Sequence, residues 1–107
     1  MNLKNIKSSI DENDICNIIF DTNNNKYNVF NESSIEDLYQ IIDNVINNPN
    51  IIGIIFSSAK SDFHQGYDLE YLYSLKSPAE IFNKVYKLTR TLRKLESIGM
   101  PITCAIS

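Results

Sequence analysis

Apolar residues fall in short runs that alternate with longer stretches of helical spacing. The runs Ile15–Phe20 and Ile51–Phe56 are rich in isoleucine and too short for helices, so we predict a β-strand at each. The second run is apolar on both sides and broken only by Gly53, as in a strand covered on both faces. A further strand is expected to begin in Pro101–Ser107.

A first long helix is predicted between the two apolar runs. Ser33 and Glu36 have the spacing of a capping box, and Asn31 is a competing cap. The helix should extend to about Asn47, because Pro49 cannot continue the hydrogen-bond ladder.

A second long helix is predicted from Pro78 to a stop at Gly99, since proline suits a first turn and glycine a C-terminal cap. A short helix is expected before it, at Asp68–Ser74. The apolar stripe of the long helix is Ile81, Val85, Leu88, Leu92 and Leu95. Strands that alternate with crossover helices predict an α/β fold with mostly parallel strands, in a single domain over residues 1–107.

Charge and cysteine usage exclude several classes of protein. A net charge of −3 argues against a nucleic-acid partner, and we interpret the acidic residues Asp11, Glu12 and Asp14 as a solvated cluster. The apolar runs are too short for a membrane span. Cys16 and Cys104 are isolated, which predicts buried free thiols, no metal site and a reducing, cytoplasmic location.

The segment from Phe63 to Leu69 is the main candidate for chemistry. It follows a strand, contains Gly66, and leads into a helix that Asp68 can cap. Backbone N–H groups at such a turn lack intrahelical partners, so they can hold an anion or an oxygen that gains negative charge. The nearby His64 is interpreted as a loop side chain rather than a catalyst.

Two motifs give this chain a resemblance to a known family. Phe63, Gly66, Asp68 and Leu69 match one, and Pro101, Ile102, Ala105 and Ile106 match a second that follows after a helix. Asn28 is also found where the family places an asparagine. The chain thereby resembles the crotonase (enoyl-CoA hydratase/isomerase) superfamily, and most of all the hydratase part of fatty-acid oxidation complex alpha subunits. The resemblance implies a crotonase-like fold of ββα repeats, present as a truncated N-terminal portion.

The resemblance also implies roles for individual residues. The backbone N–H of Tyr67 would be the first donor of an oxyanion hole, which also makes Tyr67 a residue that binds the coenzyme A thioester, and Gly66 would let the turn form. The backbone at Gln65 would meet the adenine of coenzyme A. Lys60 is a candidate for the coenzyme's phosphates, with a solvated surface lysine as the alternative. Asp68 is interpreted as structural.

Two positions depart from the family, because Tyr67 replaces a residue that is commonly alanine and Gln65 replaces a small residue. The family's second oxyanion donor and its two glutamates would lie beyond Ser107. The expected function is therefore that of an enoyl-CoA hydratase of fatty-acid β-oxidation, as an N-terminal fragment that is inactive alone. The alternative is a non-catalytic acyl-CoA-binding or oligomeric assembly module.

The expected partner is an acyl-CoA or enoyl-CoA thioester, with coenzyme A as part of the substrate and no covalently bound cofactor. The superfamily commonly forms trimers, which implies a homo-oligomer, either a trimer or a dimer of trimers. An isomerase, hydrolase, dehalogenase or decarboxylase of the same superfamily remains open, as do the acyl chain length and any attached dehydrogenase domain.

Overall fold

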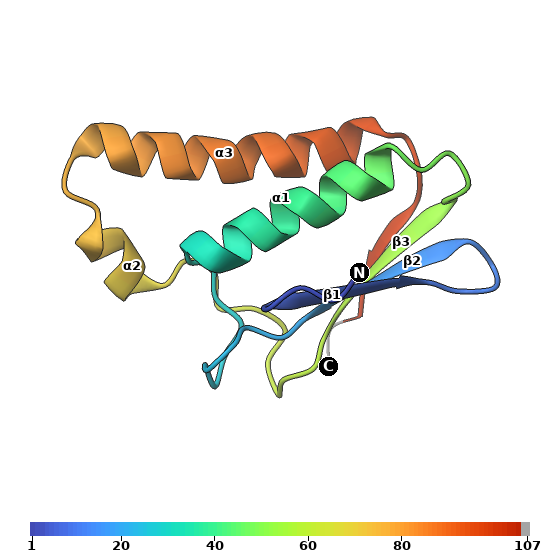
Figure 1. The fold of residues 1–107 in the computed structure, drawn as a ribbon, viewed down its shortest axis with the longest axis horizontal. Helices are drawn as coiled ribbons and strands as arrows, with labels where there is room; N and C mark the ends of the chain where they lie inside the picture. The colour runs from blue at the N-terminus through green and yellow to red at the C-terminus, as the bar shows by residue number, and fades with distance from the viewer. Residues whose placement is uncertain (106–107) are drawn as a thin grey trace.

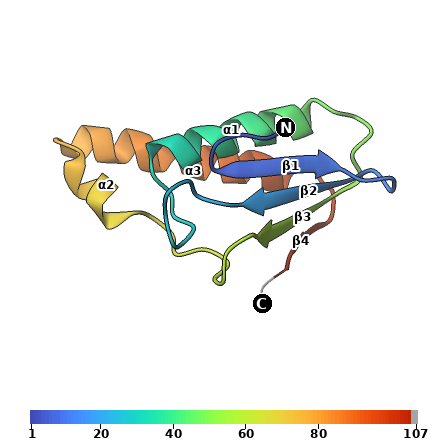
Figure 2. The ribbon, with the colours of Figure 1, turned by 60° about the horizontal axis from the view of Figure 1, so that its bottom comes forward.

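A computed structural model describes residues 1–105, which form a four-stranded sheet and three helices (Figure 1). The elements in chain order are β1 (Ile6–Ile10), β2 (Ile15–Phe20), α1 (Glu32–Ile46), β3 (Gly53–Ser58), α2 (Leu69–Ser74), α3 (Pro78–Ser97) and β4 (Ile102–Cys104). The strands lie side by side in sequence order (Figure 2). β1 is antiparallel to β2, whereas β2, β3 and β4 run parallel, so the prediction of mostly parallel strands is confirmed.

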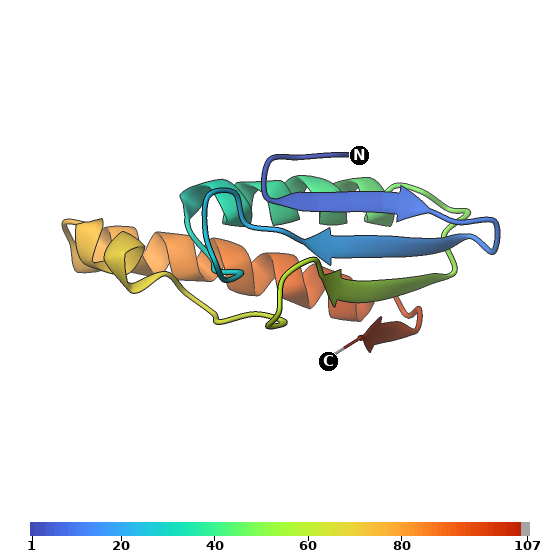
Figure 3. The ribbon, with the colours of Figure 1, turned by 90° about the horizontal axis from the view of Figure 1, so that it is seen from below.

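The core lies between one face of the sheet and the helices. Ile18 pairs with Phe56 across β2 and β3, and Cys16 pairs with Ile54, so these four buried side chains share the helix-facing side. α1 covers them with the buried residues Ile35, Leu38, Ile41, Ile42 and Val45. Seen from below, the sheet lies in front of α1 and α3, and none of the described helices covers its near face (Figure 3).

The strand predictions need two corrections. β3 begins at Gly53 rather than Ile51 and continues to Ser58, because its ladder with β2 pairs all six residues from Gly53 onward. Backbone pairing with β2 extends β3 over Ser57 and Ser58, which the hydropathy pattern alone does not assign to the strand. β1 was not predicted at all, since only Ile6 of this edge strand is buried and the rest of its sequence is largely polar.

The acidic cluster forms the turn between β1 and β2. The Asp11 carboxylate accepts hydrogen bonds from the backbone N–H groups of Asn13 (2.9 Å) and Ile15 (3.1 Å). These bonds lower the pKa of Asp11 below its ordinary value. Asp14 adopts a positive φ of 61°, which an acidic residue tolerates in a turn. The interpretation of this cluster as merely solvated was therefore incomplete.

The cap of α1 is Asn31 rather than Ser33. The Asn31 side chain accepts from the Ser34 N–H (2.9 Å), and the Ser34 hydroxyl accepts from the Asn31 N–H (2.9 Å), which closes a capping box. The chain is still extended at Phe30, because Phe30 pairs with Tyr67 in a parallel bridge. The helix therefore begins directly after that bridge.

The buried stripe of α3 is shorter than its apolar pattern predicts. Leu88, Thr91 and Leu95 are buried, whereas Ile81 and Leu92 are each 39% exposed. The N-terminal half of α3 extends past the end of α1 toward α2, where the described residues offer less surface to pack against (Figure 1). The predicted helix itself is confirmed, and Gly99 follows its end with a φ of +74°.

The last strand and its cysteine also differ from expectation. Cys16 is buried, as predicted, but Cys104 is exposed because β4 is an edge strand whose three residues are all exposed. The predicted strand Pro101–Ser107 reaches positions 106 and 107, which lie outside the described residues.

Candidate functional site

The expected turn is held against the loop before α1 by a short parallel pairing. The Phe30 N–H donates to the Gly66 carbonyl (2.7 Å), and the Asp68 N–H donates to the Phe30 carbonyl (3.0 Å). In such a bridge, the residue between the two bonded positions directs its own N–H away from the partner strand. That residue is Tyr67, and its N–H donates to no acceptor among residues 1–105.

A buried asparagine fixes this turn to the rest of the fold. Asn28 is 0% exposed, and its Oδ1 accepts from the Thr22 N–H (3.0 Å). Its Nδ2 donates to the Ser58 hydroxyl (2.7 Å) and to the Phe63 carbonyl (2.9 Å). One amide thereby joins the loop after β2, the end of β3 and the start of the turn. Hydrogen bonds of this kind, buried from water, make the local backbone rigid.

Gly66 is required for its conformation rather than for space. Its φ is +84°, where L-residues are strained, yet a Cβ built there would meet no atom within 4 Å. The Gly66 N–H donates to Nδ1 of His64 (2.9 Å), so the turn uses the histidine ring as an acceptor. The backbone thus reverses at Gly66 and presents Tyr67 in an extended conformation beside Phe30.

The His64 ring is packed among aromatic side chains. Its centroid lies 4.1 Å from that of Phe30 and 5.1 Å from that of Phe20. Burial lowers the pKa of His64 to about 4, so the ring is neutral near pH 7. Because Nδ1 accepts from the backbone, the proton of the neutral ring is on Nε2. This side chain belongs to the packing of the turn.

One cavity is lined by the turn itself, and a second is lined by the helices that follow it. The first has a volume of about 270 Å³ and an apolar wall, to which the turn contributes Phe63 and His64. Its other lining residues are Phe20, Phe30, Leu38, Phe56, Leu92 and Cys104. It lies on the helix-facing side of the sheet, and its wall can accept hydrocarbon but offers few hydrogen-bonding groups.

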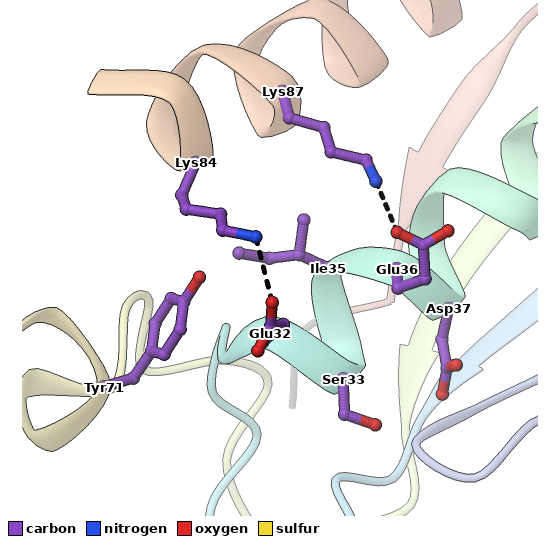
Figure 4. A pocket seen from close by; sticks show the side chains of 8 residues that line it. All are labelled: Glu32, Ser33, Ile35, Glu36, Asp37, Tyr71, Lys84 and Lys87. Carbon is purple, nitrogen blue, oxygen red and sulfur yellow. Dashed lines mark hydrogen bonds and ion pairs between the residues drawn. The ribbon is translucent and has the colours of Figure 1, made fainter. Parts of the chain in front are cut away.

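The second cavity is larger, at about 480 Å³, and its wall is charged (Figure 4). It is lined by Glu32, Ser33, Ile35, Glu36, Asp37, Tyr71, Lys84 and Lys87. Ion pairs connect α1 to α3 across it: Lys84 donates to Glu32 (2.9 Å), and Lys87 donates to Glu36. The hydrogen bond to Glu32 raises the pKa of Lys84 above its ordinary value.

Asp68 has the structural role that the sequence predicted. It is the N-cap of α2, and its carboxylate accepts from the Glu70 N–H (3.1 Å). A carboxylate is favoured there by the unpaired N–H groups of the first turn.

Besides Tyr67, the residues assigned to coenzyme binding are Gln65 and Lys60, and both make hydrogen bonds within the protein. The Gln65 N–H donates to the Asn28 carbonyl (2.8 Å), and its side chain donates to Asp62 (3.0 Å), whereas its carbonyl accepts no hydrogen bond from residues 1–105. The Lys60 side chain is 14% exposed and pairs with Asp21 (3.2 Å). It also donates to the Asn25 carbonyl (2.6 Å), so it differs from a solvated surface lysine.

Sequence reasoning missed the residues that support the turn and those of the charged cavity. Thr22 and Ser58 hold Asn28, but a threonine and a serine at such separations have no recognisable spacing. Tyr71 could have been noticed, because it lies only four residues after Tyr67 in the sequence. Lys84 and Glu32 come from different helices, so only the tertiary fold brings them together.

Within residues 1–105, no group of three or more histidine, cysteine or acidic side chains is arranged to hold a metal ion. The helices of this part of the chain are also too short or too polar to cross a bilayer.

No family model matches the chain. Among curated proteins, the fatty acid oxidation complex subunit alpha of Pseudomonas savastanoi pv. phaseolicola is 30% identical over 98 residues, which are 90% of this chain and 14% of that protein. The solved enoyl-CoA hydratase of Shewanella pealeana superposes with a TM-score of 0.86 at 16% identity, over 99% of this chain and 40% of its own. That of Bacillus anthracis has a TM-score of 0.82 at 19% identity, over 95% of this chain and 39% of its own.

The chain thus spans 14% of its curated relative and about two-fifths of the solved enzymes. Its structural neighbours are enoyl-CoA hydratases, and the curated protein that it resembles over most of its length is a fatty acid oxidation complex alpha subunit. The predicted fold class is confirmed: this chain has the crotonase fold, over the part of that fold that residues 1–105 provide.

Proposed function

We propose that this chain forms the thioester-binding part of an enoyl-CoA hydratase-type enzyme of fatty-acid β-oxidation. The observation that carries the proposal is the Tyr67 N–H, which is directed away from its partner strand and lacks an acceptor among the described residues. The names of the similar proteins, an enoyl-CoA hydratase and a fatty acid oxidation complex alpha subunit, support the choice of substrate.

In this proposal the Tyr67 N–H donates a hydrogen bond to the thioester carbonyl oxygen. When water adds to the β-carbon of a 2-enoyl thioester, negative charge develops on that oxygen, and a fixed donor stabilises the charge. Removing one such donor typically lowers the rate by about 10²–10³-fold. A second donor and the acid–base carboxylates would come from outside this chain, so we expect the 107-residue chain alone to bind thioesters without turning them over.

Coenzyme A enters the proposal only as part of the substrate. The Gln65 carbonyl, which accepts no hydrogen bond within residues 1–105, would accept one from the adenine amino group. Lys60 would have to leave Asp21 and the Asn25 carbonyl before it could meet a phosphate. We therefore assign the first contact with coenzyme A to Gln65 and keep Lys60 as a secondary candidate. In this proposal the enzyme acts in the cytoplasm.

A second candidate function is a non-catalytic assembly module, and the outer face of α3 favours it. Phe82 is 66% exposed and Tyr86 is 50% exposed, and their rings stack with centroids 5.7 Å apart. The Arg90 guanidinium lies over the Tyr86 ring at 5.7 Å. Aromatic residues and arginine are the types that dominate protein–protein hot spots. A homo-oligomer formed through this face is compatible with either function.

Calorimetric titration with butanoyl-CoA tests the proposed function. We expect saturable binding by the wild-type chain and a marked loss of affinity in Gly66→Ala. Free coenzyme A is the control, and it should bind more weakly because it lacks the thioester carbonyl that the Tyr67 N–H would contact. Two results together would instead support the assembly module. The chain would fail to bind butanoyl-CoA, and light scattering would show an oligomer that the substitution Phe82→Ser dissociates.

A further inference from the structure

The charged cavity contains one polar atom that nothing in the described part of the chain satisfies. The hydroxyl oxygen of Tyr71 is buried, and it makes no hydrogen bond within residues 1–105. In Figure 4 the hydroxyl points from α2 toward the side chains of Glu32 and Lys84. Buried hydroxyl groups are almost always paired, so an unpaired one facing a cavity calls for a ligand atom.

The Tyr71 hydroxyl is a donor rather than an anion at neutral pH. Burial raises the pKa of Tyr71, Lys84 lowers it by a smaller amount, and the carboxylates of Glu32 and Glu80 raise it further. Burial and, by a smaller amount, Tyr71 raise the pKa of Tyr67. A neutral phenol that lacks a partner offers one hydrogen bond to an acceptor oxygen.

This cavity is lined in part by the first turns of the two helices that follow the Phe30–Tyr67 bridge along the chain. Phe30 and Tyr67 form the bridge, and α1 and α2 start two residues after them, at Glu32 and Leu69. Glu32 and Tyr71, on the first turns of these helices, line the cavity. We take as a premise that an acyl group whose carbonyl is held at Tyr67 extends along α2 toward this cavity.

The wall of the charged cavity is unsuited to a hydrocarbon chain. Glu32 and Glu36 each use one oxygen in an ion pair with α3, and an apolar ligand would remove water from these charges without replacing its hydrogen bonds. An acyl group that carries an oxygen would instead accept from Tyr71 and could donate to a free carboxylate oxygen. A plain hydrocarbon chain would fit the apolar cavity better.

We infer that Tyr71 donates a hydrogen bond to an oxygen atom of the acyl group, so that the site selects acyl-CoA thioesters that carry a hydroxyl or carbonyl oxygen beyond the β-carbon. This inference rests on the proposed function, because it takes the thioester carbonyl to lie at Tyr67. Tyr71 is then a residue that determines specificity, and it plays no part in the addition of water.

The test measures dissociation constants of the 107-residue chain for two matched pairs of ligands. The pairs are 4-hydroxybutanoyl-CoA with butanoyl-CoA, and 5-hydroxypentanoyl-CoA with pentanoyl-CoA. In at least one pair, the hydroxylated thioester should bind about tenfold more tightly to the wild-type chain. Tyr71→Phe should abolish that preference. Tyr73→Phe is the matched control on the same helix, since Tyr73 is 83% exposed, and it should retain the preference.

The outcomes distinguish a failure of the inference about Tyr71 from a failure of the proposed thioester-binding function. Equal binding of both members of each pair, or an unchanged preference in Tyr71→Phe, would overturn the role of Tyr71 and leave thioester binding intact. If no thioester binds at all, the proposed function fails and the inference fails with it.

Unfolding by urea without ligand tests the premise. An unpaired hydroxyl predicts that Tyr71→Phe unfolds at the wild-type midpoint or above, like Tyr73→Phe. A midpoint clearly below that of the control would show that the hydroxyl was already paired.

Discussion

Replacing Gly66 with alanine tests the geometry of the turn, and the chain supplies its own control. Gly66 and Gly99 have similar positive φ values, +84° and +74°, and a Cβ at either would meet no atom within 4 Å. Both substitutions therefore impose the same backbone strain without a steric clash. They differ only in place: one is in the candidate site, and the other follows α3.

The magnitude follows from the left-handed conformation. An L-residue there costs about 1–2 kcal/mol relative to glycine, so Gly66→Ala and Gly99→Ala should each lower the free energy of unfolding by about that amount. The strain at position 66 would be relieved by rotating the peptide that precedes Tyr67. That rotation weakens the bond from the Phe30 N–H to the Gly66 carbonyl and redirects the Tyr67 N–H.

The assay combines urea unfolding with titration by butanoyl-CoA. Equal losses of stability are expected in the two variants, with a loss of thioester affinity in Gly66→Ala alone. If both variants bind like the wild type, the assigned turn is not the binding site. If Gly99→Ala loses affinity as well, the effect is one of stability, and the local argument fails.

Three further predictions concern the surroundings of the turn. Asn28→Ala removes the hydrogen bonds of a fully buried side-chain amide to Thr22, Ser58 and Phe63, so it should lower the free energy of unfolding by about 3–5 kcal/mol in urea titrations. Asn23→Ala, an exposed change in the same loop, should have little effect. The pKa of His64 is lowered to about 4, so the unfolded chain binds more protons between pH 6.5 and 4. Stability should therefore fall as the pH drops through that window, and His64→Phe should flatten the dependence; an unchanged slope would contradict the burial argument. Alkylation of the native chain should modify Cys104 rapidly and Cys16 only on unfolding, which mass spectrometry of the labelled peptides can check.

Local patterns predicted the elements that carry strong apolar or capping signals. The strand Ile15–Phe20 has the same bounds in sequence and structure, and Pro78 begins the long helix in both. Asp68 was placed at a helix start, and it caps α2. In each case a single segment contains the whole signal.

The misses have a common physical cause, because each depends on contacts between distant segments. The cap of α1 is Asn31 because Phe30 is still paired with Tyr67 at that point. Ile81 remains well exposed because the N-terminal half of α3 extends past its partner helix, and Leu92 remains exposed where it lines the apolar cavity. Apolar periodicity cannot reveal where a neighbouring element ends.

The candidate site shows the same division. The glycine turn and Tyr67 could be named from the motif, although their chemistry remains a proposal. The support from Thr22 and Ser58 to Asn28, and the charged cavity beside Tyr71, emerge only when strand ends and helix starts are brought together. A site built from backbone groups leaves little trace in side-chain sequence beyond its glycine.

The most direct measurement is the nuclear magnetic resonance signal of one backbone amide. With isotope-labelled tyrosine, the chain gives six tyrosine amide signals, of which one is Tyr67. Butanoyl-CoA should shift the Tyr67 signal downfield as its carbonyl oxygen accepts the hydrogen bond, whereas S-butyl-CoA, which lacks that oxygen, should not. A Tyr67 signal that stays in place with butanoyl-CoA, or moves equally with both ligands, would contradict the account.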